Sequence, residues 1–397
     1  MSKPLSGWVD STIGEQCDVI AGQSPEGKFY NDAGIGLPFY QGKKEFGEKY
    51  IGPPNIWTSH ITKEAYSGDI LMSVRAPVGP INFSTQNICI GRGLAAIRAG
   101  DGIDKEFLFY TLMSLQNEII GNEGAVFASI NKKQIENIKL SHPPLPEQKR
   151  IVAILDEAFA GIARATANTE KNLANARELF ESYLNNVFTQ RGEGWVDKKL
   201  SSLCYKITVG HVGKMASKYI EQGIPFLRSQ NIQPFRVVLD NVKYIDDDFH
   251  SSLPKSALQP SDVVIVRTGY PGTAAVIPQS LPFANCSDLV IAKPKEILSP
   301  YYLATFMNSS YGKKKVGVNL VGAAQKHYNV SAAKNIDMPL PPLEEQQTIV
   351  SNVEQFLKET QHLEAIYQKK LTALAELKQS ILQKAFTGEL TANTVEQ

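Results

Sequence analysis

The sequence predicts an α+β protein in which two globular domains of mixed α/β structure are separated by two long antiparallel coiled-coil helices. Motifs of the first half recur in the second half of the 397-residue chain, which predicts a tandem repeat with pseudo-two-fold symmetry. Each half opens with short apolar runs separated by Gly and Pro, a pattern typical of strands and loops. Each half then closes with a long stretch almost free of Gly and Pro, which predicts a helix.

The repeat is carried by matched motifs at a near-constant spacing. Residues 7–10, Gly-Trp-Val-Asp, recur 187 positions later at residues 194–197. Towards the end of each half the offset becomes 198, and HPPLPEQKRIV at 142–152 is matched by LPPLEEQQTIV at 340–350. The change of offset indicates insertions within equivalent loops. The chain is therefore expected to contain the same structural unit twice.

The repeat also fixes the expected organisation of the chain. The predicted segments are a first globular domain at 1–142, a first helix at 143–190, a second globular domain at 191–340, a second helix at 341–390 and a tail at 391–397.

The two helices are predicted over residues 145–188 and 343–386. Glu147 and Glu345 lie in the expected first turns, where a negative charge suits the helix dipole. Apolar residues at coiled-coil spacing predict a seam along each helix: Leu155, Ile162, Thr169, Leu173, Ala176, Phe180, Tyr183 and Val187, and Val353, Phe356, Leu363, Tyr367, Leu371, Leu374, Leu377 and Ile381. A helix of this length spans about 66 Å. Burying one seam against the other requires the second helix to run back antiparallel, so the domains are expected to lie a fixed distance apart.

Composition restricts the classes of function. The net charge is +1 with a pI near 7.6, so any nucleic-acid contact must come from local basic loops or from a partner. No apolar run has the length of a membrane span, and the N-terminus lacks an apolar signal core, which predicts a cytoplasmic protein without membrane contact. The four cysteines show no metal-ligand spacing and recur at equivalent places, so they are expected to be small buried core residues.

With these motifs in place, the sequence resembles the specificity (S) subunit of type I restriction–modification systems. The resemblance rests on the tandem arrangement, on LPEQKRIV and LEEQQTIV at the two helix starts, and on the tail KQSILQKAFTGEL at 378–390. It implies that each globular domain is a target recognition domain and that the helices are conserved spacers. It further implies a bipartite asymmetric DNA target, with one half-site read per domain and a gap set by the spacers. Domains that read one face of a duplex must sit about one helical turn, or 10 base pairs, apart.

The resemblance also implies partners and cofactors. Such a subunit is not itself catalytic and binds double-stranded DNA, two methyltransferase (M) subunits and, with them, restriction (R) subunits that translocate and cut DNA. No cofactor or metal is expected in this chain. S-adenosylmethionine is expected in the methyltransferase, and ATP and Mg in the restriction subunit.

Duplex recognition needs Lys and Arg for phosphates and planar hydrogen-bonding side chains for base edges. The candidate DNA-binding residues are Lys28, Lys43, Lys44, Arg75, Arg92 and Lys132 in the first domain, and His211, Lys214, Lys218, Arg228, Gln230, Asn231, Arg267, Gln325, Lys326 and His327 in the second. Arg75 and Arg267 stand out because both follow an apolar strand and precede a loop with Pro and Gly.

Two other classes of function stay open at this point, a stand-alone nuclease or methyltransferase with cryptic motifs and a coiled-coil scaffold with no DNA role. Residues 22–28, GQSPEGK, match a phosphate-binding loop, but Phe29 replaces the hydroxyl that would hold magnesium. No Asn/Asp-Pro-Pro-aromatic methyltransferase motif occurs. Asp246, Asp247 and Asp248 are read as an exposed turn, and the divergence of the two domains argues against a simple scaffold.

Overall fold

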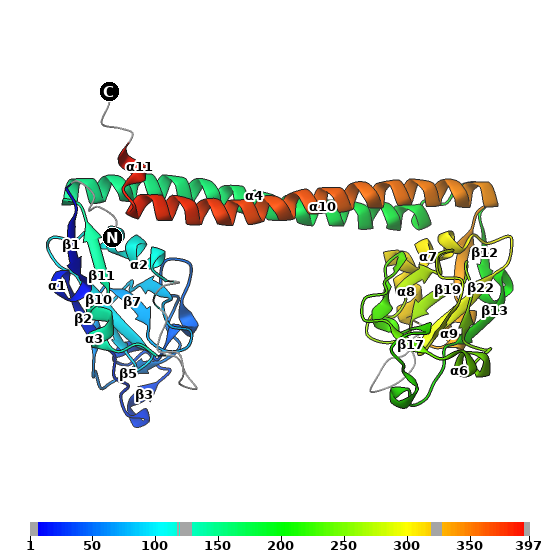
Figure 1. Ribbon diagram of the computed structural model, residues 1–397, viewed down its shortest axis with the longest axis horizontal. Coiled ribbons are helices and arrows are strands. Elements are labelled where there is room, and N and C mark those ends of the chain that lie inside the picture. The colour runs from blue at the N-terminus through cyan, green and yellow to red at the C-terminus, as the bar shows by residue number, and fades with distance from the viewer. Residues whose placement is uncertain (1–6, 117–118, 120–128, 319–327, 393–397) are drawn as a thin grey trace. The chain divides into compact units, whose positions relative to one another are not determined.

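The computed structural model describes residues 7–116, 119, 129–318 and 328–392 (Figure 1). The chain divides into two compact units, each made from two stretches of sequence. Unit 1 combines Met1–Thr169 with Lys370–Gln397, and unit 2 is Glu170–Lys369. Each unit therefore contains one globular domain together with one part of each long helix.

The domain of unit 1 contains a small two-stranded sheet, an antiparallel sheet and a mixed sheet. Their strand orders are β1(Val9–Thr12)-β11(Lys139–His142); β2(Cys17–Ala21)-β10(Leu94–Ala99)-β7(Ile70–Ser73)-β8(Ile81–Phe83); and β3(Tyr30–Asn31)-β5(Trp57–Thr58)-β4(Leu37–Tyr40)-β9(Ile88–Ile90)-β6(Glu64–Ala65). The helices are α1(Ile13–Gln16), α2(Lys105–Ser114) and α3(Lys132–Glu136), with short 3₁₀ turns η1(Gly27–Phe29) and η2(Lys43–Glu45).

The domain of unit 2 repeats this topology, except that its mixed sheet has no counterpart of β3 among the described residues and a further two-stranded sheet is present. Its sheets are β12(Val196–Lys199)-β23(Asp337–Leu340); β13(Cys204–Val209)-β22(Leu289–Pro294)-β19(Val263–Val266)-β20(Ala274–Val276); β17(Lys243–Ile245)-β14(Ile224–Leu227)-β21(Ala284–Cys286)-β18(Ala257–Leu258); and β15(Ile232–Gln233)-β16(Arg236–Val237). The helices are α5(Leu200–Leu203), α6(Asp247–Ser252), α7(Pro300–Asn308), α8(Ser310–Val318) and α9(Val330–Lys334), with turns η3(Ala216–Lys218) and η4(Ser229–Asn231).

Strand pairing confirms the internal repeat at the level of single residues. In each domain one parallel pair stands among antiparallel ones, β4 with β9 and β14 with β21. Cys89 pairs with Phe39 in the first domain, and Cys286 pairs with Leu227 in the second. All four cysteines are buried free thiols, as predicted. All four lie in strands, where a free cysteine behaves as a small buried apolar residue.

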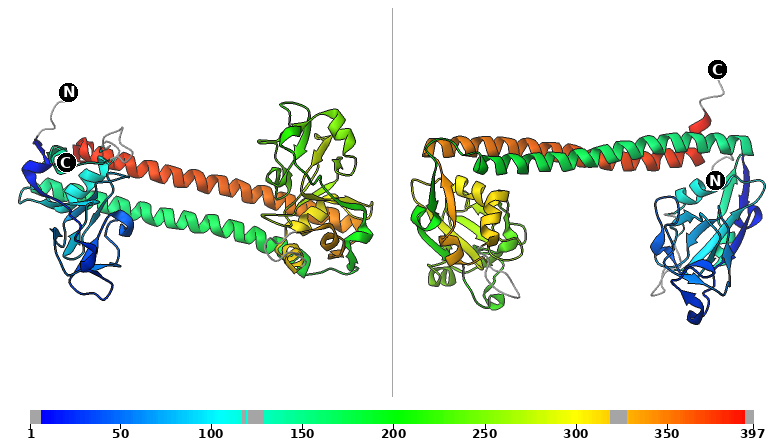
Figure 2. Two further views of the ribbon diagram at one scale, coloured as in Figure 1. Left: turned by 90° about the horizontal axis from the view of Figure 1, so that it is seen from below. Right: turned by 180° about the vertical axis from the view of Figure 1, so that it is seen from behind.

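The two long helices are confirmed, as α4(Leu145–Thr189) and α10(Leu343–Phe386), followed by the short helix α11(Glu389–Ala392). In both units α4 and α10 lie side by side (Figures 1 and 2). In unit 1, Phe159 of α4 lies beside Lys378 of α10. In unit 2, the α4 residues Arg177 and Phe180 meet Glu364 and Phe356 of α10. The later residue of α4, Phe180, contacts the earlier residue of α10, Phe356, so the two helices run antiparallel within unit 2.

The apolar seam is only partly as predicted. On α4, Leu155, Thr169 and Phe180 are buried, and the other expected seam residues are half-buried. On α10 the assignment of Leu363 and Leu377 is wrong, because they are 41% and 47% exposed. A strict seven-residue count drifts around a helix with 3.6 residues per turn, and these two positions have rotated away from α4.

The helix ends are continuous with the domain cores. In unit 1, Ile151 and Leu155 of α4 and Leu382 of α10 belong to the same core cluster as Phe107 of α2. In unit 2, Phe188 of α4 and Val353 of α10 join the core around α7. In the described part of the chain, no helix combines the length and apolar character needed to cross a bilayer.

Candidate nucleic-acid interface

In each unit one buried glutamine at the start of a long helix hydrogen-bonds that helix to the globular domain. Gln148, fully buried in the first turn of α4, accepts a hydrogen bond from the Asp104 backbone N–H at 2.8 Å. Its Nε2 donates to the carbonyl oxygens of Gly102 at 3.0 Å and Pro143 at 2.8 Å. Asp104 in turn caps α2. The bonds to Asp104 and Gly102 therefore join the start of α4 to the loop that begins α2, and the bond to Pro143 closes the turn that enters α4.

The second unit repeats this junction. Gln346 is fully buried, accepts from the Ser299 backbone N–H at 2.8 Å and donates to the carbonyl oxygens of Ile297 and Pro341 at 3.0 Å each. Ser299 caps α7. The glutamine that recurs in the two helix-start motifs is therefore explained, because a buried amide side chain can satisfy a donor and two acceptors at once.

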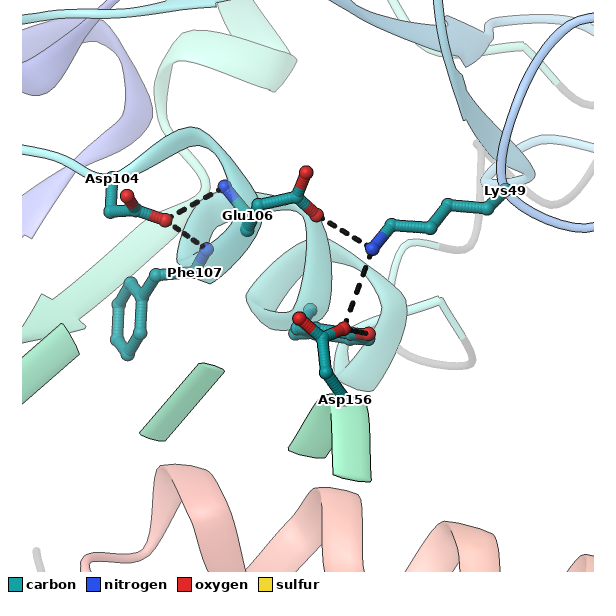
Figure 3. Close-up of polar contacts among 6 residues, drawn as sticks. Lys49, Asp104, Glu106, Phe107 and Asp156 are labelled. Atoms are coloured by element: carbon teal, nitrogen blue, oxygen red, sulfur yellow. Dashed lines mark hydrogen bonds and ion pairs between the residues drawn. The ribbon is translucent and has the colours of Figure 1, made fainter. Parts of the chain in front are cut away.

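A second contact joins the first domain to α4, and it is ionic (Figure 3). The Lys49 ammonium lies 2.8 Å from a Glu106 carboxylate oxygen and 3.5 Å from Asp156 Oδ1, and the Tyr110 hydroxyl donates to Asp156 at 2.5 Å. Burial opposes the charge on Lys49, but the hydrogen bond to Glu106 and the nearby Tyr110 and Asp156 raise its pKa overall. Lys49 therefore stays charged at neutral pH.

Four candidate residues of the first domain are exposed on loops. Lys28 lies in η1, Lys43 and Lys44 in η2, and Arg92 follows β9. Lys28 forms an ion pair with Glu26 at 2.7 Å, but its side chain remains 65% exposed. Exposed ion pairs of this kind are weak and exchange readily for a phosphate.

The other two candidates of this domain differ in their surroundings. Arg75 is exposed just after β7, and its backbone pairs with Ser129. Lys132 begins α3 and forms an ion pair with Glu136 at 3.4 Å. Both guanidinium and ammonium groups lie at the surface, where they could reach a phosphate.

In the second domain, one group of candidates surrounds an aromatic ring. The His211 ring lies edge-on to Phe249 with centroids 5.9 Å apart, and the Lys218 ammonium lies 5.1 Å from the Phe249 ring centroid. Lys214 is exposed on the intervening loop. The structure thus brings His211 and Lys218 together around Phe249, a residue that sequence reasoning missed.

The 228–231 segment is divided between surface and interior. Gln230 is exposed, whereas Asn231 is fully buried. The Asn231 amide donates to the carbonyl oxygens of Val238 and Asp240, and its oxygen accepts from the Arg228 backbone N–H. Asn231 therefore shapes this loop from inside and does not present its amide to solvent.

Arg267 is held by the protein itself. Its guanidinium binds the Asp288 carboxylate at 2.6 Å and donates to the Tyr328 carbonyl oxygen at 3.1 Å, and its side chain is only 17% exposed. The two arginines matched in sequence, Arg75 and Arg267, thus have unlike surroundings. Gln325, Lys326 and His327 lie outside the described residues.

A groove in the second domain adds residues that the sequence did not single out. The cavity, of about 740 Å³, lies between the η4 loop, the turn after β19 and α8. Gln230 and Gln233 line one side, Tyr270 is 84% exposed at the turn, and Lys313 comes from α8. The turn sequence Gly269-Tyr270-Pro271 could have signalled an aromatic residue projected outward by turn formers.

The motifs considered for enzymatic chemistry adopt other structures. Residues 22–28 lead into η1 and then β3, without the helix whose N-terminus holds phosphate in a phosphate-binding loop. Asp246 caps α6 by accepting from the Phe249 backbone N–H. Among the residues that the structure describes, no three His, Cys, Asp or Glu side chains are grouped to hold a metal ion.

Known proteins resemble this chain over both repeats. A family model for the type I restriction modification DNA specificity domain matches residues 5–174 and again residues 192–373. A Methanocaldococcus jannaschii relative named for the type I restriction enzyme MjaX specificity subunit is 47% identical over 136 residues, 34% of this chain and 32% of that relative. The Escherichia coli type I restriction enzyme EcoBI specificity subunit is 24% identical over 317 residues, 74% of this chain and 67% of that relative.

Two solved structures share the fold over almost the whole chain. One, from work on complex assembly and conformational transition of the type I R-M system, superimposes with a TM-score of 0.81 at 21% identity, covering 98% of this chain and 100% of the other. The HsdS subunit from Thermoanaerobacter tengcongensis gives a TM-score of 0.62 at 20% identity, covering 98% and 99%.

Proposed function

We propose that this chain, which belongs to the type I restriction modification DNA specificity domain family, is the DNA sequence-specificity subunit of a type I restriction–modification complex. Each globular domain reads one half of a bipartite asymmetric DNA target. The observation that carries the proposal is the family domain present twice on one topology, with unlike loops at equivalent places. A chain that read two identical half-sites would not need that divergence.

The chain is proposed to act without chemistry of its own. It positions two methyltransferase subunits, which bind S-adenosylmethionine, and restriction subunits, which use ATP and Mg. The near-neutral charge supports this dependence, because phosphate neutralisation drives most DNA affinity and this chain has a net charge of only +1. Specific binding is therefore expected from the assembled complex, and weak binding from the chain alone.

Methylation mapping tests the proposal. DNA from cells that express this chain with its neighbouring methyltransferase is expected to carry a split methylated motif. In a matched variant, four residues are inserted into both α4 and α10 at positions that face each other. Four helical residues add about 6 Å, close to two base pairs of about 3.4 Å each.

The gap in the motif is therefore expected to lengthen by one or two base pairs while both half-sites stay the same. A four-residue insertion in a surface turn away from the candidate DNA contacts, such as the one at Gln279, is the control and should leave the gap unchanged. Absence of any methylated motif in cells that produce both proteins would contradict the proposed function. A motif whose gap ignores the helix insertion would contradict the role of the helices as spacers.

A further inference from the structure

A loop of each domain contacts the long helices, and the two loops occupy equivalent places in the repeat. The contacts differ in their chemistry. In the first domain, the segment between β4 and β5 carries Lys49 to α2 and α4. In the second domain, the segment that follows β14 carries Phe235, whose ring lies 6.2 Å from that of Phe180 on α4. Phe180 in turn packs on Phe356 of α10, with ring centroids 5.8 Å apart. One contact is ionic and the other is apolar.

The side chains that make each contact follow this difference, whereas the cavities beside them are lined by both charged and apolar residues. Tyr110 of α2 lies six residues after the cap residue Asp104, and the corresponding residue of α7, six after Ser299, is Thr305. A cavity of about 230 Å³ beside Lys49 is lined by Tyr110 and Phe159 and also by Glu48, Asp156 and Lys378. The cavity of about 260 Å³ beside Phe235 is lined by Val276, Val353 and Leu357 and also by Arg236, Glu354 and Lys358.

The loop that carries Lys49 has a fixed backbone. The Phe83 backbone N–H donates to the Lys49 carbonyl oxygen at 2.8 Å, and the Asn82 side chain bonds both the N–H and the carbonyl oxygen of Gly47. The same loop holds Lys43 and Lys44, which are exposed. Lys49 lies five residues after Lys44 on this hydrogen-bonded loop, so its side chain ties the segment with these predicted phosphate contacts to α4.

We propose that Lys49 is a positioning residue, which holds the DNA-facing loop at 43–49 in register with the spacer helix α4 by binding Glu106 and Asp156. The inference rests on the proposed function and adds an asymmetry to it. Recognition of one half-site depends on a salt-sensitive ionic contact, and recognition of the other depends on an apolar contact. Salt screens a half-buried ion pair less than an exposed one, but it does not screen apolar packing, so the ionic contact is the more salt-sensitive of the two.

The test uses the complete complex of this chain with its methyltransferase. Methylation rates are measured on duplexes that carry the full target, or a single base-pair change in either half-site, and discrimination is the ratio of the two rates. For Lys49→Met we expect discrimination to fall about tenfold, the equivalent of about 1.4 kcal/mol, in one half-site only. Lys49→Arg, which keeps the charge and can still bind both carboxylates, should restore most of it.

Phe235→Ala should lower discrimination in the opposite half-site. Lys139→Met, which removes an exposed lysine from β11 of the same domain, is the matched control and should change neither. Equal losses in both half-sites for Lys49→Met, no loss at all, or a failure of Lys49→Arg to restore discrimination would overturn the proposal. The target itself would still be methylated, so this failure is distinct from failure of the proposed function.

If the Lys49→Met complex does not assemble, the unmodified complex gives an independent test. Discrimination in both half-sites is measured as salt is raised from about 50 to 200 mM, a range over which ion pairs are screened further, while the loss of phosphate contacts affects matched and mismatched duplexes alike. The proposal requires discrimination to fall more steeply in one half-site than in the other. Parallel decline in both would overturn it.

Discussion

At the scale of single residues, the same amino acid can be exposed in one domain and held by hydrogen bonds in the other. Arg75 is exposed, whereas Arg267 is tied to Asp288 and to the Tyr328 carbonyl oxygen. The sequence makes the two arginines look equivalent, because both follow a buried strand. The difference arises from Asp288, which lies 21 positions from Arg267 and which no local pattern connects to it.

Substitution of the two arginines should separate these roles. Arg267→Ala is expected to lower the free energy of unfolding by about 2 kcal/mol, because it removes two charge-assisted hydrogen bonds. Arg75→Ala should change stability by less than about 0.5 kcal/mol but lower the DNA affinity of the complex and reduce its salt slope by about one. Chemical denaturation and salt-dependent binding measure the two effects. An Arg75→Ala complex with unchanged affinity would remove Arg75 from the interface.

The buried glutamines lead to a second prediction at this scale. Gln148→Ala leaves the Asp104 N–H and two carbonyl oxygens without their partner, so we expect a loss of about 3 kcal/mol in the free energy of unfolding. Gln347→Ala is the control, because its side chain is exposed one position beyond the equivalent glutamine in unit 2. Similar denaturation midpoints for the two variants would contradict the role of Gln148.

At the scale of elements, the long helices are stabilised by unequal parts of their apolar stripes. Phe356 on α10 contacts the rings of Phe180 and Tyr183, at centroid distances of 5.8 and 5.0 Å. Leu363, two turns further on, is 41% exposed. The helix pairing therefore depends on aromatic packing near the second domain more than on a uniform leucine seam.

Alanine substitutions along α10 test this unequal distribution. Phe356→Ala should cost about 3 kcal/mol, because it removes a large ring from a packed site. Leu363→Ala should cost less than about 1 kcal/mol, since little surface is buried there. Unfolding monitored by circular dichroism gives both values. A larger loss of unfolding free energy for Leu363→Ala would show that Leu363 belongs to the packed seam.

At the scale of the whole molecule, the sequence predicted the features that repeat. The tandem topology and the long helices follow from matched motifs and from the exclusion of Gly and Pro, and the twofold match to the family model confirms the family assignment. Residues in loops were harder to predict. The burial of Asn231 and the contact of Lys49 with Asp156 depend on loop paths that no periodicity records. The DNA contacts named from the sequence stay predictions.

Each of the two units has its own apolar core, so we predict that the units unfold locally and independently of each other. The reactivity of the four buried cysteines can measure this unfolding. Cys17 and Cys89 lie in unit 1, and Cys204 and Cys286 lie in unit 2. Burial raises the pKa of Cys17 to about 11 and that of Cys204 to about 12. Since the thiolate is the reactive form, alkylation of the folded chain at pH 8 should be slow and should accelerate as pH rises.

Gln148→Ala weakens only unit 1, so alkylation of Cys17 and Cys89 should accelerate, by roughly 100-fold for a loss of about 3 kcal/mol. Cys204 and Cys286 should react at the original rate, and Gln346→Ala should give the opposite pattern. Labelling with iodoacetamide followed by peptide mass spectrometry measures all four sites in one sample. Equal acceleration at all four cysteines in either variant would mean that the units open together, because the continuous helices α4 and α10 then couple the two cores into one cooperative structure.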